Sequence, residues 1–82
     1  MDFKAGQVVK SAAGRDKGRL LAVIGEENGF VLVCDGKERP LGKPKMKNPK
    51  HIEKTSMFIE SDSMATNPKL RKTLTRLSKH GR

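Results

Sequence analysis

Lysine and arginine side chains offer the clearest chemistry in this sequence, because they gather in two segments instead of spreading evenly. The 82 residues include 18 Lys and Arg against nine Asp and Glu, which gives a formal net charge of +9. Residues 37–54 carry a net charge of +5 and residues 63–82 carry +6, whereas residues 1–36 are neutral overall. Clustered cations attract polyanions, so the sequence predicts a phosphate-rich partner.

A short charged loop is a further candidate for phosphate contact. In Gly14-Arg15-Asp16-Lys17-Gly18, two glycines bracket three charged residues. The segment is too short for a nucleotide-binding P-loop and lacks its Lys-Ser/Thr ending. The Arg15 and Lys17 side chains, together with the backbone amides, suit phosphate oxygens. The alternative is a tight loop between strands whose charges are simply solvated.

The segment that follows residue 42 has an alternating charge pattern. Lys43, Lys45 and Lys47 occupy every second position, so an extended backbone would point them to one side, along a phosphate backbone. Asn48 and His51 have side chains that suit sugar or base edges. The alternative is a charged edge strand that prevents sheet-to-sheet aggregation. The predicted nucleic-acid contacts are Arg15, Lys17, Arg19, Lys43, Lys45, Lys47, Asn48, Lys50 and His51, with Gly14 and Gly18 as loop glycines.

Catalytic and metal-binding patterns are missing from the sequence. There is no Ser/His/Asp arrangement, carboxylate pair or metal-ligand spacing, so we expect a non-enzyme without cofactor or metal. His51 and His80 are far apart and lack partner ligands. The single cysteine, Cys34, cannot form an internal disulfide, which favours a reduced compartment. The longest apolar runs have five residues against the roughly 20 that span a bilayer, so we expect a cytoplasmic protein without membrane contact.

Short β-branched runs separated by glycine-bearing segments must position these side chains. This pattern is typical of a small all-β barrel or sandwich. Asp35-Gly36 predicts a two-residue hairpin turn. The expected core residues are Val9, Val23, Val31 and Val33. The expected strands are residues 6–11, 19–25, 29–35, 38–43 and 49–53.

The C-terminal part has a different pattern. Residues 55–66 show no clear period and predict a linker, whereas Asn67-Pro68 predicts the cap and first position of a helix that ends near Gly81. A helix of about 12 residues is marginal alone in water, so we expect this tail to stay mobile until RNA or a protein orders it, in preference to docking on the β-domain. The helix has an apolar stripe of Leu70, Leu74 and Leu77 and basic flanks, the predicted tail contacts, of Lys69, Lys72, Arg76 and Lys79.

The first hairpin resembles a known motif. Gly6–Gly18 followed by Arg19–Ile24 resembles a KOW motif, and the similarity continues through Val31–Lys37 and Pro44–Ile52. The longer pattern, over residues 4–54, is similar to the archaeal and eukaryotic large-subunit ribosomal protein family fourteen-e. It is also similar to short bacterial KOW-domain RNA-binding proteins.

The resemblance implies a small SH3-like five-stranded barrel over residues 1–54 that binds RNA through basic loops, followed by a linker (55–66) and a basic tail (67–82). Three Phe without Trp or Tyr are too few for a base-stacking platform, which favours structured RNA. We therefore expect a ribosomal or ribosome-associated component that binds large-subunit ribosomal RNA, with ribosomal proteins as possible neighbours, and that is monomeric off the ribosome. Two alternatives stay open: a transcription-associated nucleic-acid-binding KOW module and an SH3-like protein-interaction module.

Overall fold

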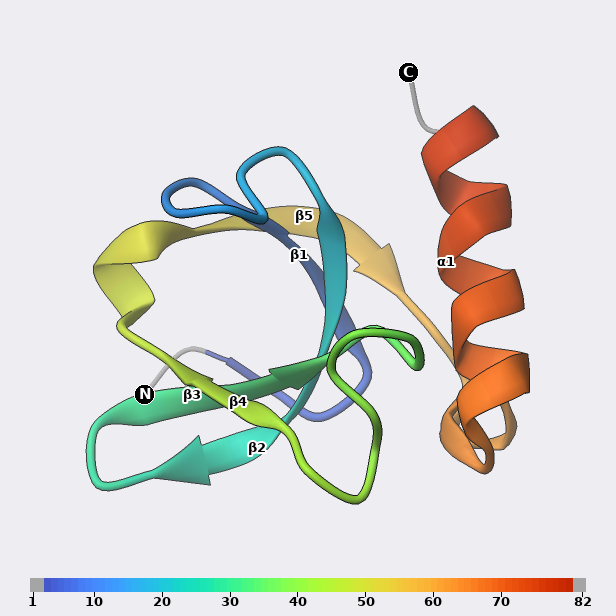
Figure 1. Ribbon diagram of the computed structural model, residues 1–82, viewed down its shortest axis with the longest axis horizontal. Coiled ribbons are helices and arrows are strands. Elements are labelled where there is room, and N and C mark those ends of the chain that lie inside the picture. Colours follow the sequence, from blue (N-terminus) through green and yellow to red (C-terminus); the bar gives the residue numbers. More distant parts are fainter. Residues whose placement is uncertain (1–2, 81–82) are drawn as a thin grey trace.

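Five antiparallel strands and one C-terminal helix make up this structure, a computed structural model that describes residues 3–80, with His80 by its backbone only (Figure 1). The strand order is β4-β3-β2-β1-β5, so the described sheet is open and has β4 and β5 at its edges. The elements are β1 (Gln7–Ser11), β2 (Leu20–Glu27), β3 (Phe30–Cys34), β4 (Lys45–Lys47), the 3₁₀ turn η1 (Pro49–His51), β5 (Ile52–Phe58), the 3₁₀ turn η2 (Ser61–Met64) and α1 (Asn67–His80).

The core lies on the inner face of the curved sheet. Alternating residues of β1, β2 and β3 point to this face, because successive side chains of a strand point to opposite sides. The four predicted core valines are all fully buried, so that prediction is confirmed. The inner cluster consists of Val9, Leu21, Val23, Val31, Val33 and Ile52, with Phe3 packed against it.

Part of the outer face of the same strands is also apolar and buried, and α1 packs against this part. Val8, Ala22 and Cys34 form one buried cluster with Leu70 and Leu74 of the helix. Full burial of each leucine stabilises the docked helix by about 1.5–3 kcal/mol. The expectation of a mobile tail is therefore wrong: the leucine stripe docks on the sheet, because β1–β3 present apolar side chains on both faces.

Within the described residues, no helix is long and apolar enough to cross a bilayer.

The start of α1 is fixed by contacts that differ from the predicted cap. The Oγ1 atom of Thr66 accepts the Lys69 amide hydrogen at 3.3 Å, so Thr66, and not Asn67, caps the helix. Asn67 Oδ1 instead accepts the Leu41 amide hydrogen at 2.7 Å and ties the loop after β3 to the helix. The predicted helix end near Gly81 lies outside the described residues.

Gly36 gives this loop its close approach to the helix. It has a φ of +80°, and a Cβ atom there would overlap Asn67 O and lie 2.9 Å from Arg71 N. A glycine is needed here both for its positive φ and for the space that a side chain would take.

The second half of the sheet departs from the predicted strands. Residues 38–43 form no strand, because Asp35 organises a longer loop in place of a two-residue turn: its Oδ1 accepts the Lys37 and Arg39 amide hydrogens at 2.8 and 2.9 Å. Residues 49–51 form η1, and β5 continues to Phe58, inside the predicted linker. The Thr55 hydroxyl stabilises this extension by donating to Val8 O at 2.6 Å. The first three strands lie close to their predicted positions.

Candidate nucleic-acid interface

Lys47, a predicted RNA contact, is buried. Only 6% of the residue is exposed, and its ammonium donates to Ser11 Oγ at 2.9 Å, Ala13 O at 2.9 Å and Asp16 Oδ1 at 3.1 Å. An ammonium has three N–H donors, and all three have an acceptor here. The prediction that Lys47 contacts a phosphate backbone is therefore wrong, because its charge is neutralised inside the protein.

This buried network shapes the loop at residues 12–19. Asp16 points inward and accepts a hydrogen bond from the Ser11 hydroxyl at 2.8 Å, while its neighbours Arg15 and Lys17 are exposed. Burial by itself would raise the pKa of Asp16, but hydrogen bonds from Ser11 and Lys47 and the charge of Lys47 together lower that pKa. The network thus keeps the Asp16 carboxylate charged and leaves the loop's two cations facing solvent.

The two loop glycines close this turn. Gly14 and Gly18 have φ values of +86° and +88°, a region that favours glycine. The Gly18 amide donates to Ser11 O at 2.8 Å, and the Lys17 amide donates to Gly14 O at 3.2 Å. The loop is thus held by backbone hydrogen bonds as well as by the buried network around Lys47.

The predicted row of three lysines is not formed. Lys43 lies in a turn, where its amide donates to Pro40 O at 3.0 Å, and only Lys45 and Lys47 belong to β4. Met46 between them is the exposed residue of that strand. Asn48 is exposed, but its Oδ1 caps η1 by accepting the Lys50 amide hydrogen at 2.9 Å.

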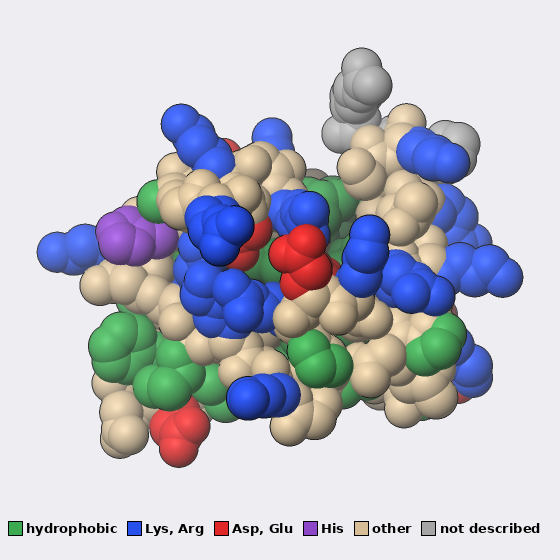
Figure 2. Space-filling view, in the orientation of Figure 1, with side chains coloured by type: hydrophobic (Ala, Val, Ile, Leu, Met, Phe, Trp, Pro, Cys, Tyr) green, Lys and Arg blue, Asp and Glu red, His purple; other side chains and the backbone are tan. Residues whose placement is uncertain are grey.

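Besides Asn48, three predicted contacts of this segment are open to solvent. Lys43, Lys50 and His51 are exposed, whereas Lys45 is half-buried. Figure 2 shows Lys and Arg side chains spread over this face of the molecule, several of them on the side of α1. Lys43, Lys50 and His51 are accessible to a ligand, but they do not line the groove described next.

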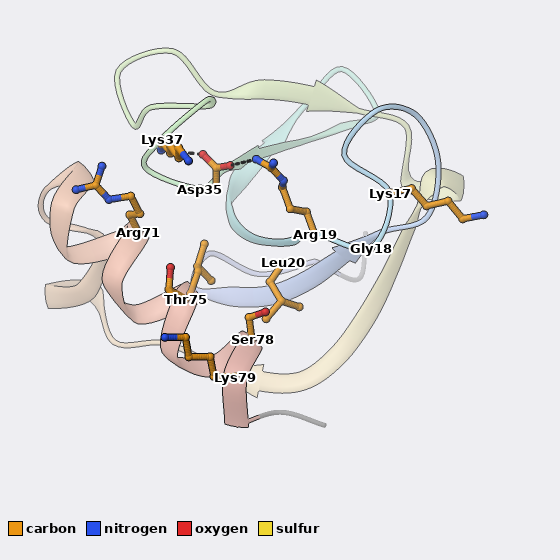
Figure 3. Close-up of a pocket in the computed structure, with 11 residues that line it drawn as sticks. Lys17, Gly18, Arg19, Leu20, Asp35, Lys37, Arg71, Thr75, Ser78 and Lys79 are labelled. Carbon is orange, nitrogen blue, oxygen red and sulfur yellow. Dashed lines mark hydrogen bonds and ion pairs between the residues drawn. The ribbon is translucent and has the colours of Figure 1, made fainter.

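A groove lies between the first hairpin, the loop after β3 and α1 (Figure 3). We call it the hairpin–helix groove; its cavity volume is about 510 Å³. Thr75 and Ser78 point from α1 toward the cavity, and Arg19 and Asp35 lie opposite, whereas the Lys17 side chain points away from it. The lining residues are Lys17, Gly18, Arg19, Leu20, Asp35, Lys37, Arg71, Leu74, Thr75, Ser78 and Lys79.

The groove is strongly cationic. Five Lys or Arg residues line it with one carboxylate, Asp35. Arg19 is the only one of these cations with an ion pair in the described part of the chain: it lies 3.6 Å from Asp35 Oδ2 and 3.3 Å from Glu38 Oε1. These contacts hold the half-exposed Arg19 guanidinium at the groove, whereas the other four cations have no ion-pair partner among residues 3–80.

Only one of the predicted tail contacts reaches this groove. Lys79 lines it, whereas Lys72 and Arg76 are exposed elsewhere on α1 and Lys69 pairs with Asp62 at 3.4 Å. The sequence-based prediction missed Lys37, Arg71, Thr75 and Ser78. A signal for the helical ones was present: each follows one residue after a leucine of the apolar stripe, so they share the adjacent helix face.

In comparisons with known proteins, no family model matches this chain and no curated protein matches it. The resemblance to KOW-domain proteins therefore rests on the residues of the first hairpin and of the two later segments that carry it. The function of the chain has to be inferred from its charge, shape and packing.

Proposed function

We propose that this chain is an RNA-binding protein that contacts structured RNA through its first loop, at residues 12–19, and through the hairpin–helix groove. The observation that carries the proposal is the docking of α1 beside the first hairpin. It places Arg71 and Lys79 of the C-terminal basic segment next to Lys37 and to the hairpin cations Lys17 and Arg19, around a groove with one carboxylate. Such a surface has the charge and the donors that phosphate oxygens require.

The distribution of aromatic residues favours structured RNA over a stretched single strand. Phe30 and Phe58 are the exposed phenylalanines of the described chain, and they lie on β3 and β5. Because β2 and β1 separate these two strands in the sheet, the rings do not form one stacking platform. Binding through phosphates, 2′-hydroxyls and shape is the mode that remains, and it suits folded RNA.

The resemblance to KOW proteins extends the proposal to the ribosome. We propose that the curved sheet is an SH3-like barrel of the KOW type and that the ligand is ribosomal RNA of the large subunit. The chain would then be a cytoplasmic ribosomal or ribosome-associated protein that is monomeric when unbound. The shifts of strand register between Gln7 and Val9 and between Val23 and Gly25 support the barrel, because irregularities of this kind bend strands toward closure.

Sedimentation with ribosomal subunits tests this proposal. Purified protein is mixed with separated small and large subunits at low salt and run on sucrose gradients. We expect it in the large-subunit fraction and, because phosphate contacts are salt-sensitive, release from that fraction at high salt. Protein that stays at the top of the low-salt gradient would contradict ribosomal RNA as the ligand.

A further inference from the structure

The docking of α1 on the sheet determines which of its residues line the hairpin–helix groove. Leu70 and Leu74 are buried against the sheet, and this fixes the rotation of the helix about its axis. Arg71, Thr75 and Ser78, at positions i, i+4 and i+7, share the next face and line the groove. The Thr75 and Ser78 side chains therefore point into the cavity, whereas Arg71 and Lys79 line it at its rim, with their charged ends directed away from Arg19 and Asp35 (Figure 3).

The wall opposite α1 carries cations that are available to bind an anion. Asp35 accepts two backbone N–H groups and lies near Arg19, so its negative charge is already compensated. Arg19 is held between Asp35 and Glu38, and a guanidinium with five N–H donors keeps several of them for a ligand. Lys37 lies at the same end of the groove as Arg71, where the Gly36 backbone meets the helix (Figure 3).

We infer that the hairpin–helix groove binds the sugar–phosphate backbone of one RNA strand, with Arg71, Thr75, Ser78 and Lys79 on one side and Arg19 and Lys37 on the other. This inference rests on the proposed RNA-binding function and assigns its principal contact to a site that requires the docked helix. Phosphodiester oxygens accept hydrogen bonds and match guanidinium, ammonium and hydroxyl donors. Leu20, which is half-buried, lines the same cavity and can contact the ribose.

Two double variants of the same helix separate groove contact from general charge. R71Q/K79Q removes two cations that line the groove, and K72Q/R76Q removes two exposed cations that do not. All four residues are exposed and glutamine favours helix, so both proteins should unfold at the wild-type temperature. We expect R71Q/K79Q to lower the affinity for a large-subunit RNA fragment at least about tenfold, and K72Q/R76Q at most about threefold.

Three results would overturn the inference. Equal losses in the two variants would show diffuse attraction, with RNA binding intact but the groove not its site. Wild-type protein that binds no RNA would remove the proposed function and the groove assignment together. In an amide NMR titration, RNA should shift the signals of Gly18, Thr75 and Ser78. If inorganic phosphate or a free mononucleotide shifts them as strongly at equal concentration, the groove is a small-anion site and not a backbone site.

Discussion

The ammonium of Lys47 lies 3.1 Å from Asp16 Oδ1, inside the protein, and joins edge strand β4 to the first loop. The two residues are 31 positions apart, so this contact links two segments that are distant in the sequence. Their side chains are 7% and 12% exposed. The pair neutralises a lysine that would otherwise add to the basic surface, and it fixes the loop that presents Arg15 and Lys17.

Replacing Lys47 by Met should destabilise the fold strongly. The substitution keeps an aliphatic side chain but leaves the Asp16 carboxylate buried without its cation, which costs about 3–5 kcal/mol. Urea unfolding gives the change in the free energy of unfolding. The double variant K47M/D16L should recover most of this loss, since neither charge then remains. A loss below about 1 kcal/mol for K47M alone would show that the pair is not coupled.

Acid should weaken the protein through the same pair. The pKa of Asp16 is lower in the folded protein than its ordinary value of 3.8, so its ionised form stabilises the fold above that value. This contribution is lost as the pH falls through the folded pKa, below 3.8. In urea unfolding from neutral to acid pH, D16N should show a shallower fall in stability at the acid end than the wild type. Parallel pH curves would contradict the linkage.

The exposed cations of the loop should affect binding without affecting folding. R15A/K17A is expected to weaken RNA binding by about 1–3 kcal/mol and to leave the melting temperature nearly unchanged, because both side chains are solvated. Fluorescence anisotropy and thermal unfolding measure the two effects. A lower melting temperature with unchanged affinity would mean that these charges serve the loop structure only.

Gly36 should control the docking of α1, and Cys34 should report it. Burial, with a smaller effect of the Asp35 charge, raises the pKa of the Cys34 thiol to about 11, so the docked protein reacts slowly with thiol reagents. G36A places a methyl group against the backbone at Asn67 and Arg71 and should release the helix, exposing the thiol. We expect thiol labelling to accelerate at least about tenfold, which corresponds to a docking loss of about 1.4 kcal/mol.

G29A is the matched control for this experiment. Gly29 has a φ of +82°, close to that of Gly36, but a Cβ there meets no atom within 4 Å. It therefore carries the same backbone strain without the contact to the helix. Similar labelling rates for G36A and G29A would show that the strain, and not the contact with α1, opens the structure.

The sequence was sufficient to predict the local parts of this fold. The β-branched runs of β1, β2 and β3 and the leucine spacing of α1 repeat at periods that specify strand and helix. The four core valines follow from the same pattern. By contrast, an unbroken apolar run such as Phe30–Cys34 does not reveal that Cys34 on the outer face is buried as well as Val31 and Val33 on the inner face. The docking of α1 on the outer face could therefore not be predicted.

The parts that were mispredicted depend on contacts between distant residues. Nothing near Lys47 in the sequence distinguishes it from Lys45; its burial follows from the acceptors on Ser11, Ala13 and Asp16. The long loop after β3 depends on the Asp35 carboxylate. The groove depends on the rotation of α1, so Arg71 could be recognised only from its position beside the leucine stripe.

Salt dependence of RNA binding tests the central claim most directly. A labelled fragment of large-subunit ribosomal RNA is titrated with the full chain at several salt concentrations, and the logarithm of the affinity is plotted against the logarithm of salt. Contacts to about five to seven phosphates predict a slope of about −4 to −6. R71Q/K79Q should make this slope less negative by up to about 2, because each cation removed takes away about one phosphate contact. A wild-type slope near zero, or no binding at low salt, would contradict recognition of RNA through its phosphates.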